Sequence, residues 1–341
     1  MKRPFPLTAQ ARPVARSTAR MAGWTLAAVL LLGCVWLATA QQGAPPNNAE
    51  IHTLHVQGNV SMLIGAGGNI AVQTGKDGVL LVDTGLEQNA DKVLAEVKKL
   101  STGMIRNIIN THVHADHTGG NAKISAAGSE IVGGNFAGQV GGSSSALIIA
   151  HENVLNRMSA PTGKESPVPS GGWPSDTFFT NQKNIFFNGE AIEIIHIPSA
   201  HTDGDSIVFF RRSDVIVAGD IFVTTSYPIV DLARGGSIQG VIDGLNRIIG
   251  LAIPAEKQEG GTYVIPGHGR LCDQADVVEY RDMTTIIRDR VQDMIKKGMT
   301  LEQVKAAKPT RDYDPIYGAT TGFWTTDMFV EAVYKSLNFK K

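Results

Sequence analysis

Short apolar runs with alternating polar positions occupy much of the chain between residues 51 and 265, and they predict β-strands. The predicted strands lie at 51–64, 70–74, 79–83, 105–110, 131–132, 191–197, 206–210, 215–218 and 262–265. The turn between the second and third runs contains Asp77-Gly78, which is typical of a hairpin. We therefore expect 70–74 and 79–83 to pair.

Apolar positions three and four residues apart predict helices between and after these strands. In the strand-rich part, the predicted helices lie at 87–100, 118–127, 146–158 and 237–249. The C-terminal part carries an amphipathic stripe formed by Tyr280, Met283, Ile287, Val291 and Met294. Gly298 ends that helix, and Thr300 and Gln303 form a capping box for the next. The order of elements indicates an α/β sandwich over 51–275 with extra C-terminal helices over 276–341 packed on it.

The first forty residues have the pattern of an export signal. Five basic residues and no acidic ones precede the uncharged apolar run 24–40, which ends in Ala38-Thr39-Ala40. The run is near the minimum length for a membrane span, so an uncleaved anchor is one alternative. Lipidation at Cys34 is a second. We expect a periplasmic or secreted protein, or one anchored to a membrane and facing outside the cytoplasm, with 41–50 as a linker.

Composition narrows the class of partner. With 43% hydrophobic residues the chain can bury a sizeable core. Its net charge is −1 and would be −6 without the first forty residues, which argues against a nucleic-acid partner. Two cysteines are too few for a disulfide framework or a Cys₄ zinc finger. A small-molecule substrate is the expected partner, and oligomeric state stays open.

Candidate metal ligands are concentrated in one short segment. His112, His114, Asp116 and His117 lie within six residues, directly after the predicted strand 105–110. Three further candidates also follow predicted strands, namely His201, Asp220 and His268. Open α/β sheets build their sites from loops at one end of the strands, so we expect the seven side chains to meet.

Five imidazoles and two carboxylates are too many for one catalytic zinc, which takes three protein ligands. Two metal ions divide them naturally. The donor types suit zinc, with iron or manganese as alternatives. A pair of ions about 3.5–4 Å apart can share one carboxylate and one hydroxide, and that hydroxide would be the nucleophile.

The order of these residues resembles the metallo-β-lactamase superfamily. The matching pattern is His112-x-His114-x-Asp116-His117 followed by His201, Asp220 and His268, and it extends to the segment 80–85. The resemblance covers about 51–273 and implies a four-layer αβ/βα sandwich. It also implies the ligand sets: His112, His114 and His201 for the first metal, Asp116, His117 and His268 for the second, and Asp220 as the bridge. Asp116 and Asp220 would be catalytic, and Asp83 would brace the ligand loop.

The resemblance implies a metal-dependent hydrolase of an ester, lactone, thioester or amide, and the N-terminal pattern predicts that it is exported. Asp220 favours the branches that contain glyoxalase II, lactonases and phosphodiesterases, although the sequence after His268 departs from the glyoxalase pattern. Two alternatives are a β-lactam hydrolase and a non-hydrolytic redox diiron or binding protein of the same fold. Redox members usually carry a flavodoxin-like segment, and no such pattern follows Asp273, which favours the hydrolase.

Several other residues could belong to the site or have a purely structural role. His151, His196 and Cys272 are predicted to be structural, and 65–68 is predicted to be a turn rather than a phosphate loop. Tyr227 has two interpretations, a packing role or polarisation of a substrate carbonyl. The loops 133–145 and 160–176 are expected to contact substrate. Trp173 and Phe178–Phe179 border the second loop and either line the pocket or close its hinge.

Overall fold

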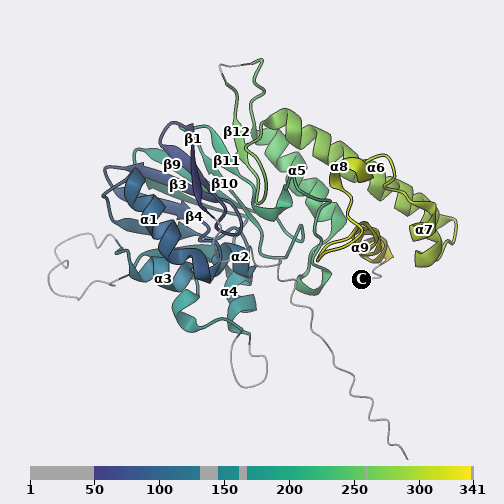
Figure 1. The fold of residues 1–341 in the computed structure, drawn as a ribbon, viewed down its shortest axis with the longest axis horizontal. Helices are drawn as coiled ribbons and strands as arrows, with labels where there is room; N and C mark the ends of the chain where they lie inside the picture. The colour runs from purple at the N-terminus through teal and green to yellow at the C-terminus, as the bar shows by residue number, and fades with distance from the viewer. Residues whose placement is uncertain (1–49, 131–144, 161–166, 258–259, 339–341) are drawn as a thin grey trace, which may run out of the picture. The chain divides into compact units, whose positions relative to one another are not determined.

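The structure is a computed structural model that describes residues 50–130, 145–160, 167–257 and 260–338 (Figure 1). Within these residues two β-sheets face each other, and helices cover their outer faces. Three hydrophobic clusters separate the four layers: one between the sheets, one between the first sheet and its helices, and one between the second sheet and its helices. This is the predicted αβ/βα sandwich.

The first sheet contains seven described strands, in the same order in space as in sequence. They are β1 (His52–Gln57), β2 (Val60–Ile64), β3 (Ile70–Gly75), β4 (Gly78–Val82), β5 (Ile105–Ile109), β6 (Leu147–His151) and β7 (Asp176–Phe178). The strands β1 to β4 are antiparallel and include the predicted hairpin, whereas β4 to β7 are parallel. Its outer face is covered by α1 (Ala90–Leu100) and α3 (Asn121–Ala126), whose apolar residues join one cluster with those of the sheet.

The second sheet has the order β12-β11-β10-β9-β8. Its strands are β8 (Gln182–Phe187), β9 (Glu190–His196), β10 (Ser206–Phe210), β11 (Val215–Val217) and β12 (Tyr263–Ile265). The strands β11 and β12 are parallel, and α5 (Ile238–Leu251) connects them. Parallel neighbours require such a crossover, because a tight turn can join only antiparallel strands.

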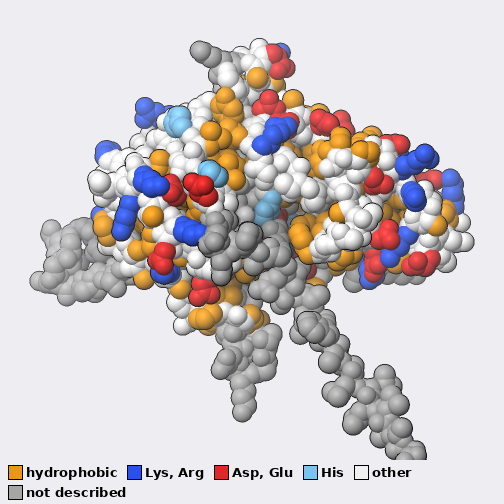
Figure 2. All heavy atoms as spheres, viewed as in Figure 1, with side chains coloured by type: hydrophobic (Ala, Val, Ile, Leu, Met, Phe, Trp, Pro, Cys, Tyr) orange, Lys and Arg blue, Asp and Glu red, His pale blue; other side chains and the backbone are white. Residues whose placement is uncertain are grey.

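Charged side chains lie mostly outside the three clusters. On the visible face of the molecule, the described Lys and Arg side chains are interspersed with Asp and Glu, while apolar side chains gather near the C-terminal helices (Figure 2).

The structure has no described helix that combines the length and the apolar character needed to cross a membrane.

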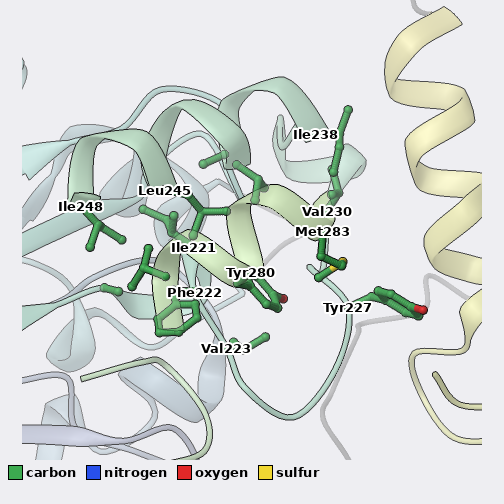
Figure 3. Packing of buried hydrophobic residues seen from close by; sticks show 14 of the residues in the cluster. Ile221, Phe222, Val223, Tyr227, Val230, Ile238, Leu245, Ile248, Tyr280 and Met283 are labelled. Carbon is green, nitrogen blue, oxygen red and sulfur yellow. The ribbon is translucent and has the colours of Figure 1, made fainter. Parts of the chain in front are cut away.

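The C-terminal helices complete the outer layer on the second sheet. They are α6 (Gln274–Lys296), α7 (Leu301–Ala307), α8 (Asp314–Tyr317) and α9 (Thr326–Asn338). The predicted stripe of α6 is buried at Tyr280, Met283, Ile287 and Val291, and the capping box of Thr300 with Gln303 is present. Figure 3 shows Tyr280 and Met283 within the cluster that also holds Phe222 and Leu245. Complete burial of such a side chain contributes about 1.5–3 kcal/mol.

The helix predicted at 146–158 is wrong over its first half. Residues Leu147–His151 form β6, which pairs with β5, and the helix α4 covers only Glu152–Ser159. A short apolar run fits a buried strand as well as a helix, and two adjacent isoleucines favour the strand. The strands β7 and β8 are not in the prediction, because β7 is only three residues long and β8 is half-exposed with weak alternation. The patch at 118–127 divides into α2 (Ala115–Thr118) and α3.

Two sequence predictions concern residues that are not described. The strand at 131–132 and nearly all of the loop 133–145 lie outside the described residues. Of the loop 160–176, the described part contains a 3₁₀-helix at Ser170–Gly172 and the first residue of β7.

Candidate metal centre

All seven predicted ligand residues follow the ends of strands and meet in one place. His112 to His117 follow β5 and continue into α2, His201 lies between β9 and β10, Asp220 follows β11 and His268 follows β12. The structure gathers them into two groups of potential metal ligands. These are His112, His114, His201 and Asp220, and Asp116, His117 and His268. In each group the ligand atoms lie within 4.8 Å of one another.

The first group is built around His201. Its Nε2 is 2.8 Å from His114 Nδ1 and 3.6 Å from Asp220 Oδ2. Asp220 Oδ2 is also 4.0 Å from His112 Nε2. Three imidazole nitrogens and one carboxylate oxygen therefore face a common point.

The second group faces the other oxygen of Asp220. His268 Nε2 is 3.2 Å from Asp116 Oδ2 and 3.4 Å from His117 Nε2. Asp220 Oδ1 is 3.1 Å from His117 Nε2 and 3.4 Å from His268 Nε2. Each carboxylate oxygen of Asp220 thus faces one group, which is the arrangement that a bridging ligand needs.

The ligand atoms themselves indicate that cations belong here. Among the described residues, His112 Nε2, Asp116 Oδ2 and both carboxylate oxygens of Asp220 are buried without a hydrogen-bond partner. A buried polar atom left unpaired costs about 1–3 kcal/mol, and more if it is charged. Metal ions would satisfy all four atoms at once, and imidazole with carboxylate suits zinc, iron or manganese. The residues therefore fit a metal centre.

Asp83 supports two of the imidazoles, His117 directly and His112 through Thr111, at the ring nitrogens that face away from the centre. Its Oδ2 is 2.8 Å from His117 Nδ1 and accepts a hydrogen bond of 2.7 Å from Thr111 Oγ1. Thr111 Oγ1 is in turn 3.0 Å from His112 Nδ1. Asp83 Oδ1 accepts from the Thr111 backbone N–H, so both oxygens fix the ligand loop. Asp83 thus makes the supporting contacts that the family resemblance implies for it.

The other two imidazoles of the first group are held by a loop that the ligand pattern does not include. His201 Nδ1 lies 2.7 Å from the carbonyl oxygen of Ile229, and His114 Nε2 lies 3.0 Å from Asp231 Oδ2. Asp231 is absent from the sequence-based candidates. It lies in a turn and follows no predicted strand, so the signal that identifies the other carboxylates does not apply to it.

Burial and neighbouring charges shift the pKa values of the ligands toward the protonation states that bind cations. Burial, reinforced by His117, lowers the pKa of His112 well below 6.5, and burial with the nearby His114 lowers the pKa of His201 to about 4. Both imidazoles are therefore neutral at pH 7. Burial opposes the charge of Asp220, but the surrounding histidines outweigh it and lower its pKa. Metal binding needs neutral imidazoles and ionised carboxylates, and these pKa shifts favour both.

His117 is the exception. Burial alone would lower its pKa, but the carboxylates of Asp220, Asp116 and Asp83 dominate and raise the pKa well above 6.5. In this arrangement a proton on His117 neutralises part of the carboxylate charge. A metal ion would replace that proton, so metal uptake should release protons.

Two glycines allow the backbone to approach the ligands closely. A Cβ on Gly68 would lie 2.4 Å from the His117 ring, and a Cβ on Gly267 would lie 2.2 Å from Asp220 Oδ1. Gly68 also donates a backbone hydrogen bond to the carbonyl oxygen of Asp116. The segment 65–68 is irregular and precedes β3, so it does not open a helix as a phosphate loop would. The sequence predicts a turn at 65–68 but does not predict that Gly68 packs against the His117 ring.

The remaining candidates lie outside the two groups. The Tyr227 hydroxyl is buried and donates to Asp314 Oδ1 at 2.9 Å, and its ring stacks on Phe329, which supports the packing interpretation. Cys272 is buried, and burial raises its pKa to about 12. Trp173 and Val113 each pack against a small cluster of buried residues in β6 and α4. Phe178 in β7 is buried in the cluster between the two sheets, while Phe179 is exposed.

His151 and His196 form a stacked pair apart from the ligands. Their ring centroids are 3.6 Å apart and the rings are nearly parallel. His151 Nδ1 accepts a hydrogen bond from the Asn153 backbone and caps α4, and His196 Nδ1 lies 3.0 Å from the carbonyl oxygen of Asp205. Both contacts are structural.

We expect acid to weaken the fold through His151. Burial, together with His196, lowers the pKa of His151 from 6.5 to about 4. As the pH falls below 6.5, the unfolded chain takes up this proton before the folded chain does. The stabilising contribution is therefore complete above pH 6.5 and is lost by about pH 4. The expected loss is about 2 kcal/mol, which is less than the full difference in pKa implies because solvent screens part of the effect.

Urea unfolding of the wild type and His151→Asn at pH 7.5 and 4.5 measures this effect. Asparagine keeps a cap on α4 and does not titrate. The difference between the two free energies of unfolding should shrink by about 2 kcal/mol at the lower pH. A difference that is the same at both pH values would contradict the prediction.

Comparison with known proteins agrees with the fold. The family described as “Metallo-beta-lactamase superfamily” matches residues 63–268. A linear primary-alkylsulfatase from Pseudomonas sp. is 23% identical over 273 residues, which are 70% of this chain and 50% of that protein. The chain therefore spans about half the length of this relative.

Solved structures show the same architecture. A stereoselective inverting sec-alkylsulfatase from Pseudomonas sp. superposes with a TM-score of 0.57 at 16% identity, over 84% of this chain and 50% of that one. A metallo-β-lactamase from Pontibacter korlensis superposes with a TM-score of 0.52 at 14% identity, over 69% of this chain and 99% of that one. At these identities the likeness concerns the fold alone.

Proposed function

The chain belongs to the metallo-β-lactamase superfamily, and we propose that it is a hydrolase of small organic molecules with a centre of two metal ions, zinc in the first instance. The observation that carries this proposal is the set of four buried, unpartnered ligand atoms on His112, Asp116 and Asp220 in the described structure. They face two common points, and Asp220 offers one oxygen to each.

The geometry supports the roles that the family resemblance implies for these residues. His112, His114 and His201 would hold the first ion, Asp116, His117 and His268 the second, and Asp220 both. Bound ions would supply a hydroxide at neutral pH and would polarise the bond under attack. Asp83 and Asp231 keep the imidazoles in place, so the centre needs little rearrangement during reaction. Asp116 and Asp220 are the two carboxylates at the centre. Because both oxygens of Asp220 would face the ions, Asp116 would be the one available to accept a proton from the attacking water.

We propose an ester as the bond that is cleaved, with lactones, thioesters and amides as further members of the class. The alkylsulfatase relative adds alkyl sulfate esters to this set. A panel of alkyl sulfate, carboxylic ester, lactone, thioester, phosphodiester and β-lactam substrates tests the proposal. Turnover with at least one substrate is expected, and the matched Asp220→Ala variant measures the background. No turnover above that background with any of them would contradict the hydrolase.

Metal analysis separates the hydrolase from a redox diiron protein. Protein purified without chelator should contain about two equivalents of metal, and a strong chelator should remove them together with turnover. Zinc added back should restore both. A constant single equivalent that added zinc does not raise would contradict the bridged pair. Two iron atoms without hydrolytic turnover would support the redox alternative.

We also propose that the basic and apolar pattern of residues 1–40 directs export and that cleavage follows Ala40. N-terminal sequencing of the protein from its native host should find Gln41 first. An intact Met1 would contradict cleavage, and a lipid on Cys34 would indicate a lipid anchor instead.

A further inference from the structure

A loop between β11 and α5 approaches the first ligand group from outside. It contains a short 3₁₀-helix at Leu232–Arg234, and Asp231 caps that helix by accepting from the Arg234 backbone N–H. The Asp231 side chain is only 9% exposed. Its Oδ2 is 3.0 Å from His114 Nε2 and 2.7 Å from Arg234 Nη1. The carboxylate therefore has one partner on a ligand residue and another at the surface.

Backbone contacts tie this loop to the segment that carries His201. The Asp231 N–H donates to the His201 carbonyl oxygen at 2.9 Å, and the Ser237 N–H donates to that of Ala200 at 2.8 Å. Ile229 contributes its carbonyl oxygen to the His201 ring. These contacts fix the position of the Asp231 backbone relative to the first ligand group. The Asp231 carboxylate is therefore held beside His114.

His114 differs from the other ligand imidazoles in its orientation. Its Nδ1 faces the centre, whereas His112, His117, His201 and His268 direct Nε2 to it. Because His114 Nε2 points at the Asp231 carboxylate, that nitrogen must carry the proton of the hydrogen bond. The lone pair on Nδ1 is then available for a metal ion. An anionic acceptor on the outer nitrogen also makes an imidazole a stronger ligand.

We propose that Asp231 is a positioning residue that holds His114 in the Nε2–H form and thereby strengthens binding of the first metal ion. This inference rests on the proposed dinuclear centre. Asp231 acts through His114 and has no place in either ligand group. Its loss should therefore affect the first ion before the second, whereas loss of Asp83 should affect both.

The test compares Asp231→Ala and Asp231→Asn with Asp203→Asn. Asp203 is a matched control because it pairs with Arg157 at 2.7 Å in the same neighbourhood, while its carboxylate is in neither ligand group. Competition with a chelator gives the affinity of each site, and cobalt substitution reports the geometry of the first site. Asp231→Ala should weaken the first site about 10- to 100-fold and leave the second within about threefold. Asp231→Asn keeps the shape and an acceptor oxygen, so its loss should be smaller, and Asp203→Asn should match the wild type.

NMR of the metal-free wild type provides a readout that needs no metal. Long-range ¹H–¹⁵N correlations should show the proton of His114 on Nε2. A proton on Nδ1, or wild-type affinity at both sites in Asp231→Ala and Asp231→Asn, would overturn the proposed role of Asp231. If the wild type keeps the Nε2 proton but binds no metal, the dinuclear centre is wrong, and the part of the proposal that concerns metal affinity is wrong with it.

Discussion

Replacing Asp220 with alanine should remove the second metal ion and lower turnover by more than about a hundredfold. Loss of a group that only supports a ligand costs about 10- to 100-fold, and Asp220 faces both ligand groups directly. Each group keeps three other ligands, but Asp220 lies closer to the second group. Its Oδ1 is 3.1 and 3.4 Å from the His117 and His268 nitrogens, whereas its Oδ2 is 3.6 and 4.0 Å from those of the first group, so the second ion should be weakened most. Metal content and turnover of the purified variant measure both effects.

A matched control distinguishes loss of the bridge from general damage to the fold. His151 is also buried, but its contacts are a helix cap and a stacked ring. His151→Ala should therefore keep the metal content of the wild type and lose stability instead. If Asp220→Ala retained two ions and full turnover, Asp220 would not be a bridging ligand.

Much of the centre is predictable from sequence because each ligand follows a buried apolar run. The runs at 105–110 and 215–218 become β5 and β11, and strand ends place the next residues at a common edge. The helical stripe of α6 is predictable for a similar reason, since its period extends over several turns. Local sequence carries both signals.

The local sequence gives much less indication of the residues that orient the ligands. Asp231 lies 117 residues from His114 along the chain, and an isolated aspartate in a turn is common for reasons unrelated to metals. The close packing of Gly68 on His117 also depends on tertiary structure, because the two segments meet only after folding. The error at β6 has the same origin, since its pairing with β5 decides between strand and helix. Asp83 was predictable only because it belongs to the family pattern.

Asp83 offers the most demanding test of how the centre is held. Its backbone has a φ of +65°, a left-handed conformation that is costly for most residues and less so for asparagine and aspartate. The strain is offset by three contacts to the ligand loop, which lead to His117 directly and to His112 through Thr111. One side chain therefore supports a ligand from each group.

Asp83→Asn separates the charge of this carboxylate from its shape. Asparagine tolerates the left-handed backbone, but it lacks the negative charge that strengthens both imidazoles. We expect the affinity for each of the two ions to fall about 10- to 100-fold. Asp83→Ala should lose the same affinity and also about 1–3 kcal/mol of stability, because alanine tolerates this backbone poorly and leaves buried donors unpaired. Chelator competition and urea unfolding of the two variants measure the two effects separately. Loss of a single ion in Asp83→Asn would mean that the contact through Thr111 does not support His112, and that Asp83 serves His117 alone.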